Sequence, residues 1–321
     1  MPSLKEIKTR IGSVNSTRKI TSAMKMVASS KLHHAQRMIE NMYPYSMMLK
    51  GMLKTFLQSD VEVDSELTLK RPVKRVALIV FSSNSSLCGG YNHNVIKLTE
   101  QVLKEYEGLG PDNILVYPIG RKIGEKVTKW GLKSAGKFVT LADKPNAQQC
   151  ADIARELSAM YVNGEIDRVE IIFHHFKSAG SQILTRETLL PFDIERELDK
   201  NIYRDLDSTI ATKDSQEYLR QRDAQQKEQK IEAFRMHDNY IVEPDKQTLL
   251  NALIPKVLNL QVYVDLLDSN ASEHAARMVA MQTATDNADE LLRLLNLQYN
   301  KSRQQAITSE LLALVGGSLN N

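Results

Sequence analysis

A heptad-like seam near the end of the chain constrains the fold more than any other feature. Apolar or aromatic residues fill eleven of thirteen positions spaced three and four apart, and the two exceptions are His274 and Thr285. The thirteen positions are Val257, Leu260, Val264, Leu267, Ala271, His274, Met278, Met281, Thr285, Ala288, Leu292, Leu295 and Tyr299. A seam sustained over about six heptads is typical of a long helix in a coiled coil. No proline follows Lys256, and Gly316-Gly317 predicts the end of the helix.

The length of this helix predicts that it needs a partner. A helix over residues 245–314 would be about 105 Å long, whereas a compact globule of 321 residues has a radius of gyration of about 20 Å. We therefore expect the helix to project from its own domain. Two starts are open: Asp245 as the N-cap residue, or Pro255 in the first turn.

A second long helix is predicted at the other end of the chain, over residues 3–58. Ser3 and Glu6 have the spacing of a capping box, and Pro44 predicts a kink or a brief interruption. The apolar stripe of this helix consists of Leu4, Ile7, Ile11, Val14, Ile20, Met24, Ala28, Leu32, Ala35, Ile39, Met42, Leu49, Leu53 and Phe56. Two long helices with matching stripes predict an antiparallel coiled coil.

The middle of the chain, residues 74–192, alternates between strand-like and helix-like segments. Strands are expected at 74–82, 113–119, 137–141, 168–176 and 182–190, and helices at 87–106, 120–130 and 147–162. This alternation is typical of a small, Rossmann-like α/β domain with a largely parallel sheet. The predicted fold class is therefore α/β: a long antiparallel coiled coil of the N-terminal helix (1–58) and the C-terminal helix (245–317), plus this domain.

Composition narrows the class of protein. The chain contains no run of eighteen apolar residues, so we expect no transmembrane helix. No leader pattern opens the chain, so we expect a protein on the cytosolic side. Cys88 and Cys150 lack metal-ligand spacing and are expected to be small buried thiols. Residues 1–58 carry ten Lys or Arg against two Glu. This surplus fits nucleic acid, an anionic surface, an acidic protein partner or a solvated face. The lack of interleaved aromatics argues against single-strand binding by stacking, and we expect no nucleic-acid partner.

The sequence gives little support for an enzyme. No G-x-x-x-x-G-K-[ST] motif occurs, and Gly108-Leu109-Gly110 precedes a strand and has no third glycine. The turn at residues 82–91 has the form of a weak anion site, but a structural turn is favoured. His174 and His175 would face opposite sides of a strand, one half-buried and one on the surface, and could not chelate one metal. We expect no catalytic residue, no cofactor and no metal.

Four stretches are specific enough to identify a family. They are SLKEIKTRIGSVNSTRKITSAMKMVASSKL at the start, SSLCGGYN after the first strand, and ASEHAARMVAMQTATDNADELL and YNKSRQQAITSELLALVGG at the end. They closely resemble the opening, the LCGGLN turn and the ending of the gamma subunits of F-type ATP synthases. The resemblance covers most of residues 1–190 and 240–317.

The resemblance implies a non-catalytic rotor subunit of the central stalk. Its coiled coil would penetrate a ring of three alpha and three beta subunits. Its α/β domain and shaft base would contact the epsilon subunit and the membrane c-ring. ATP chemistry would occur on the beta subunits, each biased by the rotational position of the asymmetric shaft. The protein would be peripheral, on the cytoplasmic side of the cell inner membrane.

Six residues match positions at which the family makes coupling contacts. Met24 matches the position that meets an acidic beta-subunit loop, and Lys25 adjoins it. Arg277, Arg303, Gln304 and Thr308 match positions that either hydrogen-bond stator loops or hold the two shaft helices together. The alternative for each residue is a solvated helix face.

One segment departs from the bacterial pattern of the family. Residues 194–239 are highly charged and glutamine-rich, which predicts a solvated insertion or partial disorder. Chloroplast members carry a regulatory insert with a cysteine pair at this place, and this segment contains no cysteine. Our hypothesis is that the insertion packs beside the shaft and restrains hydrolytic rotation.

Two other functions are alternatives to a rotor subunit. One is a coiled-coil scaffold whose α/β domain binds another protein. The other is a nucleotide-dependent enzyme with a helical dimerisation arm. Co-purification with ATPase subunits and nucleotide binding by the isolated chain would discriminate among the three.

Overall fold

The computed structural model describes residues 3–57, 65–194, 242–243 and 245–318. The expected insertion at 194–239 therefore lies outside the described residues, apart from Ile194. The chain divides into two compact units. Residues 1–30 and 277–321 form one, here the helical pair, and residues 31–276 form the other, here the α/β unit. Helices α1 (Leu4–Leu57) and α8 (Lys246–Ser318) supply residues to both.

The α/β unit is built on a five-stranded sheet. Its strands are β1 (Val76–Phe81), β2 (Ile114–Ile119), β3 (Lys133–Ser134), β4 (Arg168–Ser178) and β5 (Ser181–Leu190). Their order is β3-β2-β1-β4-β5. The first four strands run parallel, and β5 returns as an antiparallel hairpin beside β4. The largely parallel sheet predicted from the sequence is confirmed.

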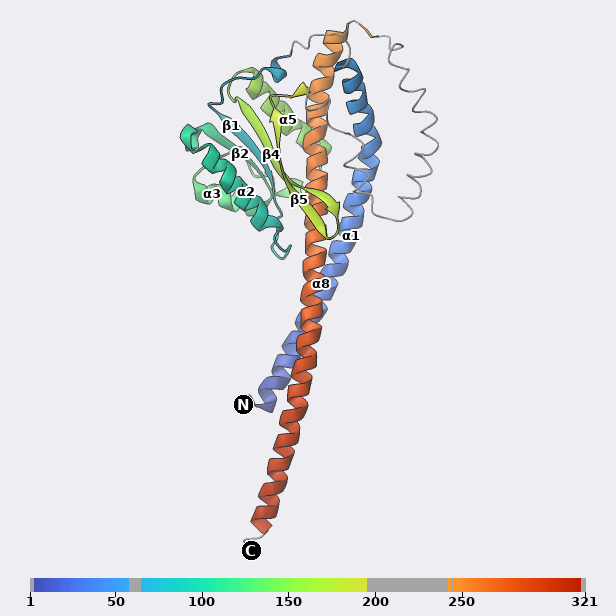
Figure 1. The fold of residues 1–321 in the computed structure, drawn as a ribbon, viewed down its shortest axis with the longest axis vertical. Helices are drawn as coiled ribbons and strands as arrows, with labels where there is room; N and C mark the ends of the chain where they lie inside the picture. The colour runs from blue at the N-terminus through green and yellow to red at the C-terminus, as the bar shows by residue number, and fades with distance from the viewer. Residues whose placement is uncertain (1–2, 58–64, 195–241, 244, 319–321) are drawn as a thin grey trace, which may run out of the picture. The chain divides into compact units, whose positions relative to one another are not determined.

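Helices cover both faces of this sheet (Figure 1). They are α2 (Tyr91–Glu105), α3 (Arg121–Trp130), α4 (Val139–Asp143) and α5 (Ala147–Val162), with 3-10 turns η1 (Glu66–Thr68), η2 (Glu107–Leu109) and η3 (Pro111–Asn113). All six residues of β1 are buried. A strand buried on both faces reads as an unbroken apolar run rather than as an alternation, which explains the VALIVF of β1.

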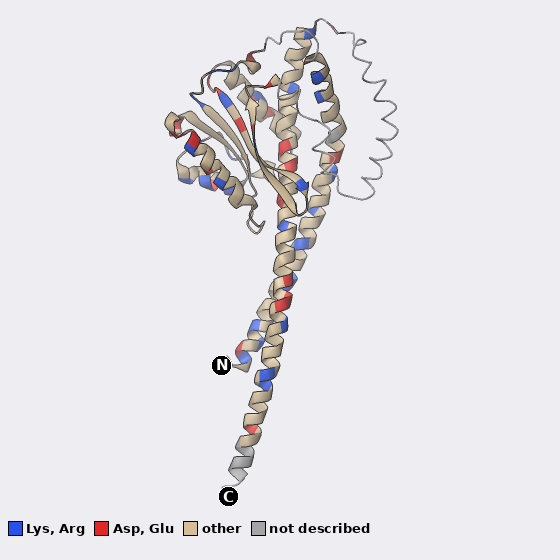
Figure 2. Ribbon diagram, viewed as in Figure 1, with Lys and Arg blue, Asp and Glu red and all other residues tan. Residues whose placement is uncertain are grey.

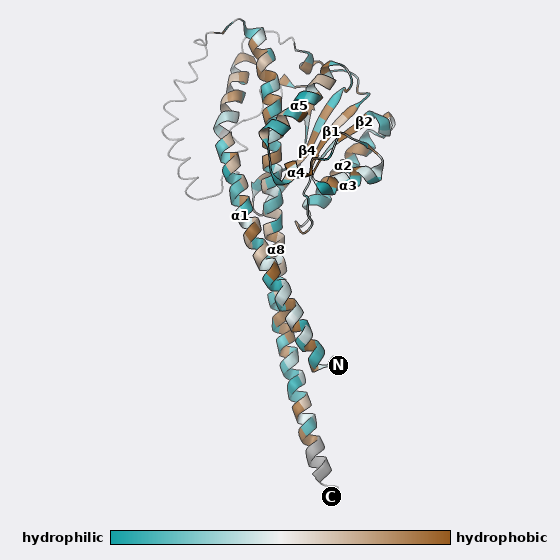
Figure 3. Ribbon diagram, turned by 180° about the vertical axis from the view of Figure 1, so that it is seen from behind, coloured by the Kyte–Doolittle hydropathy of each residue, from teal (hydrophilic) through white to brown (hydrophobic). Residues whose placement is uncertain are grey.

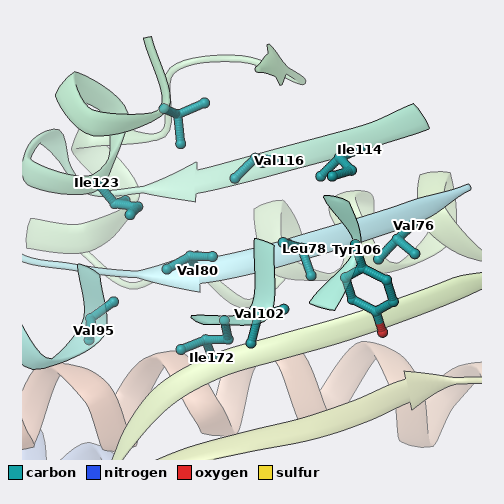
Figure 4. Close-up of a cluster of buried hydrophobic side chains, with 11 residues drawn as sticks. Val76, Leu78, Val80, Val95, Val102, Tyr106, Ile114, Val116, Ile123 and Ile172 are labelled. Carbon is teal, nitrogen blue, oxygen red and sulfur yellow. The ribbon is translucent and has the colours of Figure 1, made fainter. Parts of the chain in front are cut away.

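One face of the sheet packs against α2 and α3. Alternate residues of β1, including Leu78 and Val80, meet Val95 of α2 and Ile123 of α3 in a fully buried apolar cluster (Figure 4). Ile172 of β4 joins the same cluster. Burying such a side chain contributes about 1.5–3 kcal/mol, so this layer stabilises the α/β unit.

The opposite face packs against α5 and the first part of α8. Tyr117 of β2 donates a hydrogen bond to the sulfur of Met160 on α5, at 3.9 Å. Ile171 of β4 and Leu258 of α8 line the same small cavity, of about 20 Å³. The sheet therefore carries α8 directly on one of its faces, which fixes the start of this helix to the α/β unit.

The third strand was predicted in the wrong place. The edge strand is Lys133–Ser134, paired with Leu115 and Val116 of β2, whereas residues 139–143 form α4. Leu141 and Ala142 are both buried. The Lys144 amide donates to the Thr140 carbonyl at 2.9 Å, as in a helical turn, so the predicted strand over 137–141 is replaced by α4.

The N-termini of the two long helices are capped as expected. Ser3 and Glu6 form the predicted capping box, with the Ser3 amide donating to Glu6 Oε2 at 2.9 Å and the Glu6 amide donating to Ser3 Oγ at 3.2 Å. The Thr248 amide donates to Asp245 Oδ1 at 2.8 Å. Asp245 rather than Pro255 therefore starts α8, and Pro255 lies inside the helix.

Two expected breaks in the long helices are absent from the described residues. Helix α1 continues through Pro44, and α8 continues through Gly316 and Gly317 to Ser318. Proline costs a helix interior about 3 kcal/mol and glycine about 1 kcal/mol, because the first removes a hydrogen bond and the second adds backbone freedom. Neither cost forces a long helix to end.

Candidate partner-binding surface on the helical pair

The helical pair is held by a narrow seam between α1 and α8. Its buried residues are Ile7, Thr21 and Ala28 of α1, and Met281, Ala288, Leu292 and Leu295 of α8. The four α8 residues occupy positions of the predicted seam, which is confirmed there. Apolar residues recur along both helices at these intervals (Figure 3), as a coiled-coil seam requires.

Two polar contacts set the register of the pair. Thr21 Oγ1 and Thr285 Oγ1 share a hydrogen bond at 2.9 Å. Arg18 donates to Asp289 Oδ1 at 2.8 Å. The residue number falls on α1 as it rises on α8, so the helices run antiparallel, as predicted.

The prediction that Ile20 of α1 lies in the seam is wrong. The Ile20 side chain is 60 % exposed, and its neighbour Thr21 takes the buried position. One residue turns a helix by about 100°, so the two side chains cannot both face α8. The hydroxyl of Thr21 finds its partner on Thr285, and this cross-helix pair decides the local phase of the seam.

The register leaves the end of α8 without an α1 segment beside it. Extending the Thr21–Thr285 register one residue at a time places Leu4, the first residue of α1, opposite Ser302. The part of α8 from Arg303 to Ser318 is therefore a single helix, here the α8 tip. Burial by α1 cannot stabilise this tip, because α1 begins at Leu4.

Apolar side chains are exposed on the helical pair. On the α8 tip, Ile307, Leu311 and Leu312 are 47 %, 58 % and 68 % exposed. On the paired region, the exposed apolar residues are Ile20, Met26 and Val27 of α1 and Val279, Leu291, Leu294 and Leu297 of α8. Apolar residues distributed around a helix are typical of one that is enclosed by other protein.

The six residues singled out from the sequence lie at two places on the helical pair. Met24 and Lys25 of α1 are half-buried, beside the exposed Met26 and Val27, and Arg277 of α8 is also half-buried. The structure does not bring these together with the other three. Arg303, Gln304 and Thr308 are exposed on the α8 tip.

The position of the tip residues distinguishes between their two possible roles. Thr308 Oγ1 donates to the Gln304 carbonyl at 2.9 Å, within α8 itself. Because the α8 tip has no α1 segment beside it, Arg303, Gln304 and Thr308 are poorly placed to hold the two helices together. Their exposed side chains favour contacts with another chain, which stays a prediction.

The charge of the pair is uneven (Figure 2). Residues 4–30 of α1 carry six Lys or Arg and one Glu. Residues 277–318 of α8 carry four basic and four acidic residues. The positive surplus therefore belongs to α1, on the helix that contains Met24 and Lys25, and it suits an acidic protein surface.

Sequence reasoning missed the contacts that set the register. Thr21 was omitted from the predicted stripe, and Thr285 was noted only as a polar residue within the seam. The position of Thr285 could have revealed the contact, because a polar residue in an apolar seam often pairs with another polar residue across it. The Arg18–Asp289 pair had no such signal, since its side chains are 39 % and 53 % exposed.

Other expectations about chemistry were also tested. Cys88 and Cys150 are both buried, as predicted, and burial raises the pKa of the Cys150 thiol to about 12. Among the residues that the structure describes, no helix is long and apolar enough to span a membrane. The expectation of one half-buried and one surface histidine is wrong, because His174 is buried and the His175 side chain, beside Asp268 of α8, is only 23 % exposed.

Comparison with known proteins identifies relatives along the whole chain. The family model described as ATP synthase matches residues 3–319. The ATP synthase gamma chain of Bacteroides thetaiotaomicron is 51 % identical over 319 residues, covering 99 % of this chain and all of the relative. That of Cytophaga hutchinsonii is 36 % identical over the full length of both chains.

Solved structures share the fold at lower identity. A chain of the Euglena gracilis mitochondrial ATP synthase, in a structure of OSCP, F1 and c-ring, has a TM-score of 0.59 and 18 % identity, with 98 % of this chain and 93 % of that chain covered. A chain from the central stalk and c-ring of the Tetrahymena thermophila mitochondrial ATP synthase has a TM-score of 0.53 and 24 % identity, with 83 % and 99 % covered. With the sequence relatives, these matches establish that the chain belongs to the ATP synthase gamma chain family.

Proposed function

We propose that this chain is the central-stalk rotor subunit of an ATP synthase. In this role it couples ion flow through a membrane ring to ATP synthesis or hydrolysis on neighbouring subunits. The geometry that supports the proposal best is the α8 tip, a single helix on which the apolar residues Ile307, Leu311 and Leu312 are exposed. Such a helix is stable only when other protein surrounds it.

Each of the two units has its own proposed partner subunits. We propose that the helical pair lies within the ring of alpha and beta subunits, which would cover Ile307, Leu311 and Leu312. The base of the chain, including the α/β unit, would contact the epsilon subunit and the membrane c-ring. An acidic beta-subunit loop near Met24 and Lys25 would complement the positive surplus of α1.

The proposal assigns the chain no catalytic role of its own. ATP would be made or hydrolysed on the beta subunits, and this chain would bias those sites by differential contact as it turns. It would associate peripherally with the cell inner membrane, on the cytoplasmic side, through the complex alone. The coupling contacts would be Met24, Lys25, Arg277, Arg303, Gln304 and Thr308.

Reconstitution tests this proposal directly. Alpha and beta subunits are assembled with and without this chain, and ATP hydrolysis and rotation of a probe on this chain are measured. We expect the chain to co-assemble with them, to raise steady-state hydrolysis and to rotate on addition of ATP. Failure to co-assemble, or hydrolysis unaffected by the chain, would overturn the proposal.

A scaffold protein is the second candidate, because exposed apolar residues on the α8 tip would fit any enclosing partner. The two functions differ in what co-purifies. A rotor arrives with ATPase subunits and turns, whereas a scaffold arrives with other proteins and does not.

A further inference from the structure

A short polar stretch of α8 is buried in the α/β unit. Residues 268–272 read DSNAS. Ser269 is 1 % exposed and Ser272 is fully buried, while the Asp268 side chain is 13 % exposed. Consecutive buried polar side chains are unusual on a helix, because each costs free energy unless it is hydrogen-bonded.

These side chains bind three different elements of the α/β unit. The Tyr91 hydroxyl, at the start of α2, lies 2.6 Å from Ser269 Oγ and donates to the Ser269 carbonyl at 3.1 Å. Asn270 Nδ2 donates to the Ala142 carbonyl of α4 at 2.8 Å. Ser272 Oγ donates to the His174 carbonyl of β4 at 3.0 Å.

Asp268 adds two contacts to β4. His175 Nδ1 lies 2.5 Å from Asp268 Oδ2, and the Phe176 amide donates to Asp268 Oδ1 at 3.2 Å. The Tyr91 ring also stacks on the His174 ring, with centroids 4.5 Å apart. We call this set of contacts, from Asp268, Ser269, Asn270 and Ser272 to α2, α4 and β4, the polar joint.

The polar joint occupies the ligand-binding place of an open α/β sheet. The strand order reverses between β1 and β4, because β2 and β3 lie on one side of β1 and β4 on the other. Ligands of such folds bind beyond the carboxyl ends of the strands at this switch point. His174 lies past the β1–β4 pairing that ends at Val80–Ile172, and Tyr91 begins the helix after β1. Helix α8 therefore fills the switch point.

Directional contacts fix α8 in a way that an apolar seam cannot. A rotation of α8 by one residue, about 100°, or a shift by one turn, about 5.4 Å, would break every hydrogen bond of the polar joint. Buried donors and acceptors would then be left unpaired. Apolar contacts lose less, because the hydrophobic effect is non-directional and a volume-conserving repacking usually costs less than about 1.5 kcal/mol.

We propose that the polar joint transmits torque between the sheet with its helices α2 and α4 and helix α8, a role that rests on the proposed rotor function. It prevents α8 from turning or sliding against the sheet under load. The hydroxyls of Tyr91, Ser269 and Ser272 are positioning groups in this joint. They act through α8, and they do not touch ATP or the catalytic sites.

The test uses the assembled, membrane-reconstituted complex. The variants are Tyr91→Phe, which keeps the ring stacked on His174, and the triple variant with Ser269→Ala and Ser272→Ala added. The matched control is Thr99→Val, because the Thr99 hydroxyl is also buried but bonds only within α2, to the Val95 carbonyl at 2.8 Å. Two rates are compared: unloaded ATP hydrolysis with the ion gradient collapsed, and ATP-driven ion pumping against a gradient.

We expect unloaded hydrolysis of the triple variant to stay within about twofold of wild type, while pumping against the gradient falls by about tenfold as the barrier to slip is lowered. Tyr91→Phe should show a smaller loss of the same kind, and Thr99→Val no change in either rate. A global folding defect lowers both rates together and would not lower their ratio.

The outcomes separate this inference from the function on which it rests. If the wild-type chain neither assembles nor raises hydrolysis, the proposed function fails. If the wild type couples normally and both Tyr91→Phe and the triple variant keep the wild-type ratio of pumping to hydrolysis, the rotor function stands and the joint inference is overturned. Equal loss of both rates in every variant also overturns it.

Discussion

At the scale of single residues, the buried polar groups of the α/β unit should affect its stability most. Glu170 of β4 is 2 % exposed, and Arg186 of β5 binds it through two hydrogen bonds, at 2.9 Å and 3.1 Å. The Tyr106 hydroxyl donates to the same carboxylate at 2.8 Å. Burial, and then the Glu170 contact, raise the pKa of Tyr106.

Removing the guanidinium from this cluster should be costly. Arg186→Met leaves the Glu170 charge buried, with Arg168 at 3.6 Å as its remaining cation in the cluster, so we expect a loss of about 3 kcal/mol in the free energy of unfolding. Urea unfolding of the full chain, followed by fluorescence of its single tryptophan, Trp130 of α3, measures this.

A second arginine provides the control for this prediction. Arg155 pairs with Asp152 on the surface of α5, where both side chains are more than half exposed. Arg155→Met should cost less than about 0.5 kcal/mol. Equal unfolding midpoints for the two variants would show that the Glu170–Arg186 contact stabilises the fold no more than the surface pair does.

His174 should make the α/β unit sensitive to acid. Burial lowers the pKa of His174 from 6.5 to about 4. Between these values the unfolded chain binds a proton that the folded chain does not. The stability contribution is therefore present above pH 6.5 and is lost as the pH falls toward 4, by about 2 kcal/mol between pH 7 and pH 5.

The variant His174→Phe tests this, because it keeps a ring against Tyr91 and removes the titration. We expect the unfolding midpoint of wild type to fall more than that of the variant between pH 7 and pH 5. The other histidines are the same in both proteins, so the difference between the two profiles isolates His174. Parallel pH profiles would contradict the prediction.

At the scale of elements, the connections between strands and helices set local geometry. Gly120 joins β2 to α3 with a φ of +104°, and a Cβ placed there would lie 2.1 Å from the Ser82 carbonyl oxygen. Ser82 Oγ in turn accepts from the Ile123 amide at 3.0 Å, which closes the first turn of α3. Backbone therefore approaches backbone at a point where only glycine fits.

Gly120→Ala should destabilise the α/β unit by at least about 2 kcal/mol, since a strained φ and a backbone clash combine. Gly124, one turn further along α3, is the control. A Cβ there would make only an ordinary contact, at 4.0 Å from Pro118, so Gly124→Ala should stabilise the helix by about 0.5–1 kcal/mol. Urea unfolding that ranks the two variants the other way would refute this account.

At the scale of the whole molecule, the exposed α8 tip matters only when other subunits surround it. Arg303→Ala should leave the α/β unit folded, because Arg303 lies on the tip, outside that unit. In the assembled complex we expect ATP-driven rotation or ATP synthesis to fall about fivefold, the factor that corresponds to ~1 kcal/mol of lost contact energy.

The control for Arg303 is another exposed arginine, Arg155→Ala in the α/β unit. It should retain wild-type turnover, and its circular dichroism should match that of Arg303→Ala. Wild-type rotation and synthesis from Arg303→Ala would remove this residue from the proposed coupling contacts.

The two long helices, the alternation that builds the sheet and the family could all be predicted from the amino-acid sequence. These depend on local propensity, on apolar periodicity and on uninterrupted motifs, which are properties of neighbours along the chain. The α8 seam at Met281, Ala288, Leu292 and Leu295 was predictable for the same reason.

Contacts between residues in distant segments could not be predicted and were found only in the folded structure. It chose Thr21 over Ile20 for the seam, placed the strand at 133–134 and not at 137–141, and buried Ser269 and Ser272 against α2 and β4. Such choices depend on which donor finds an acceptor many residues away, and on which side chain fits a surface built by other elements. Neither is encoded in the spacing of residues along one helix or strand.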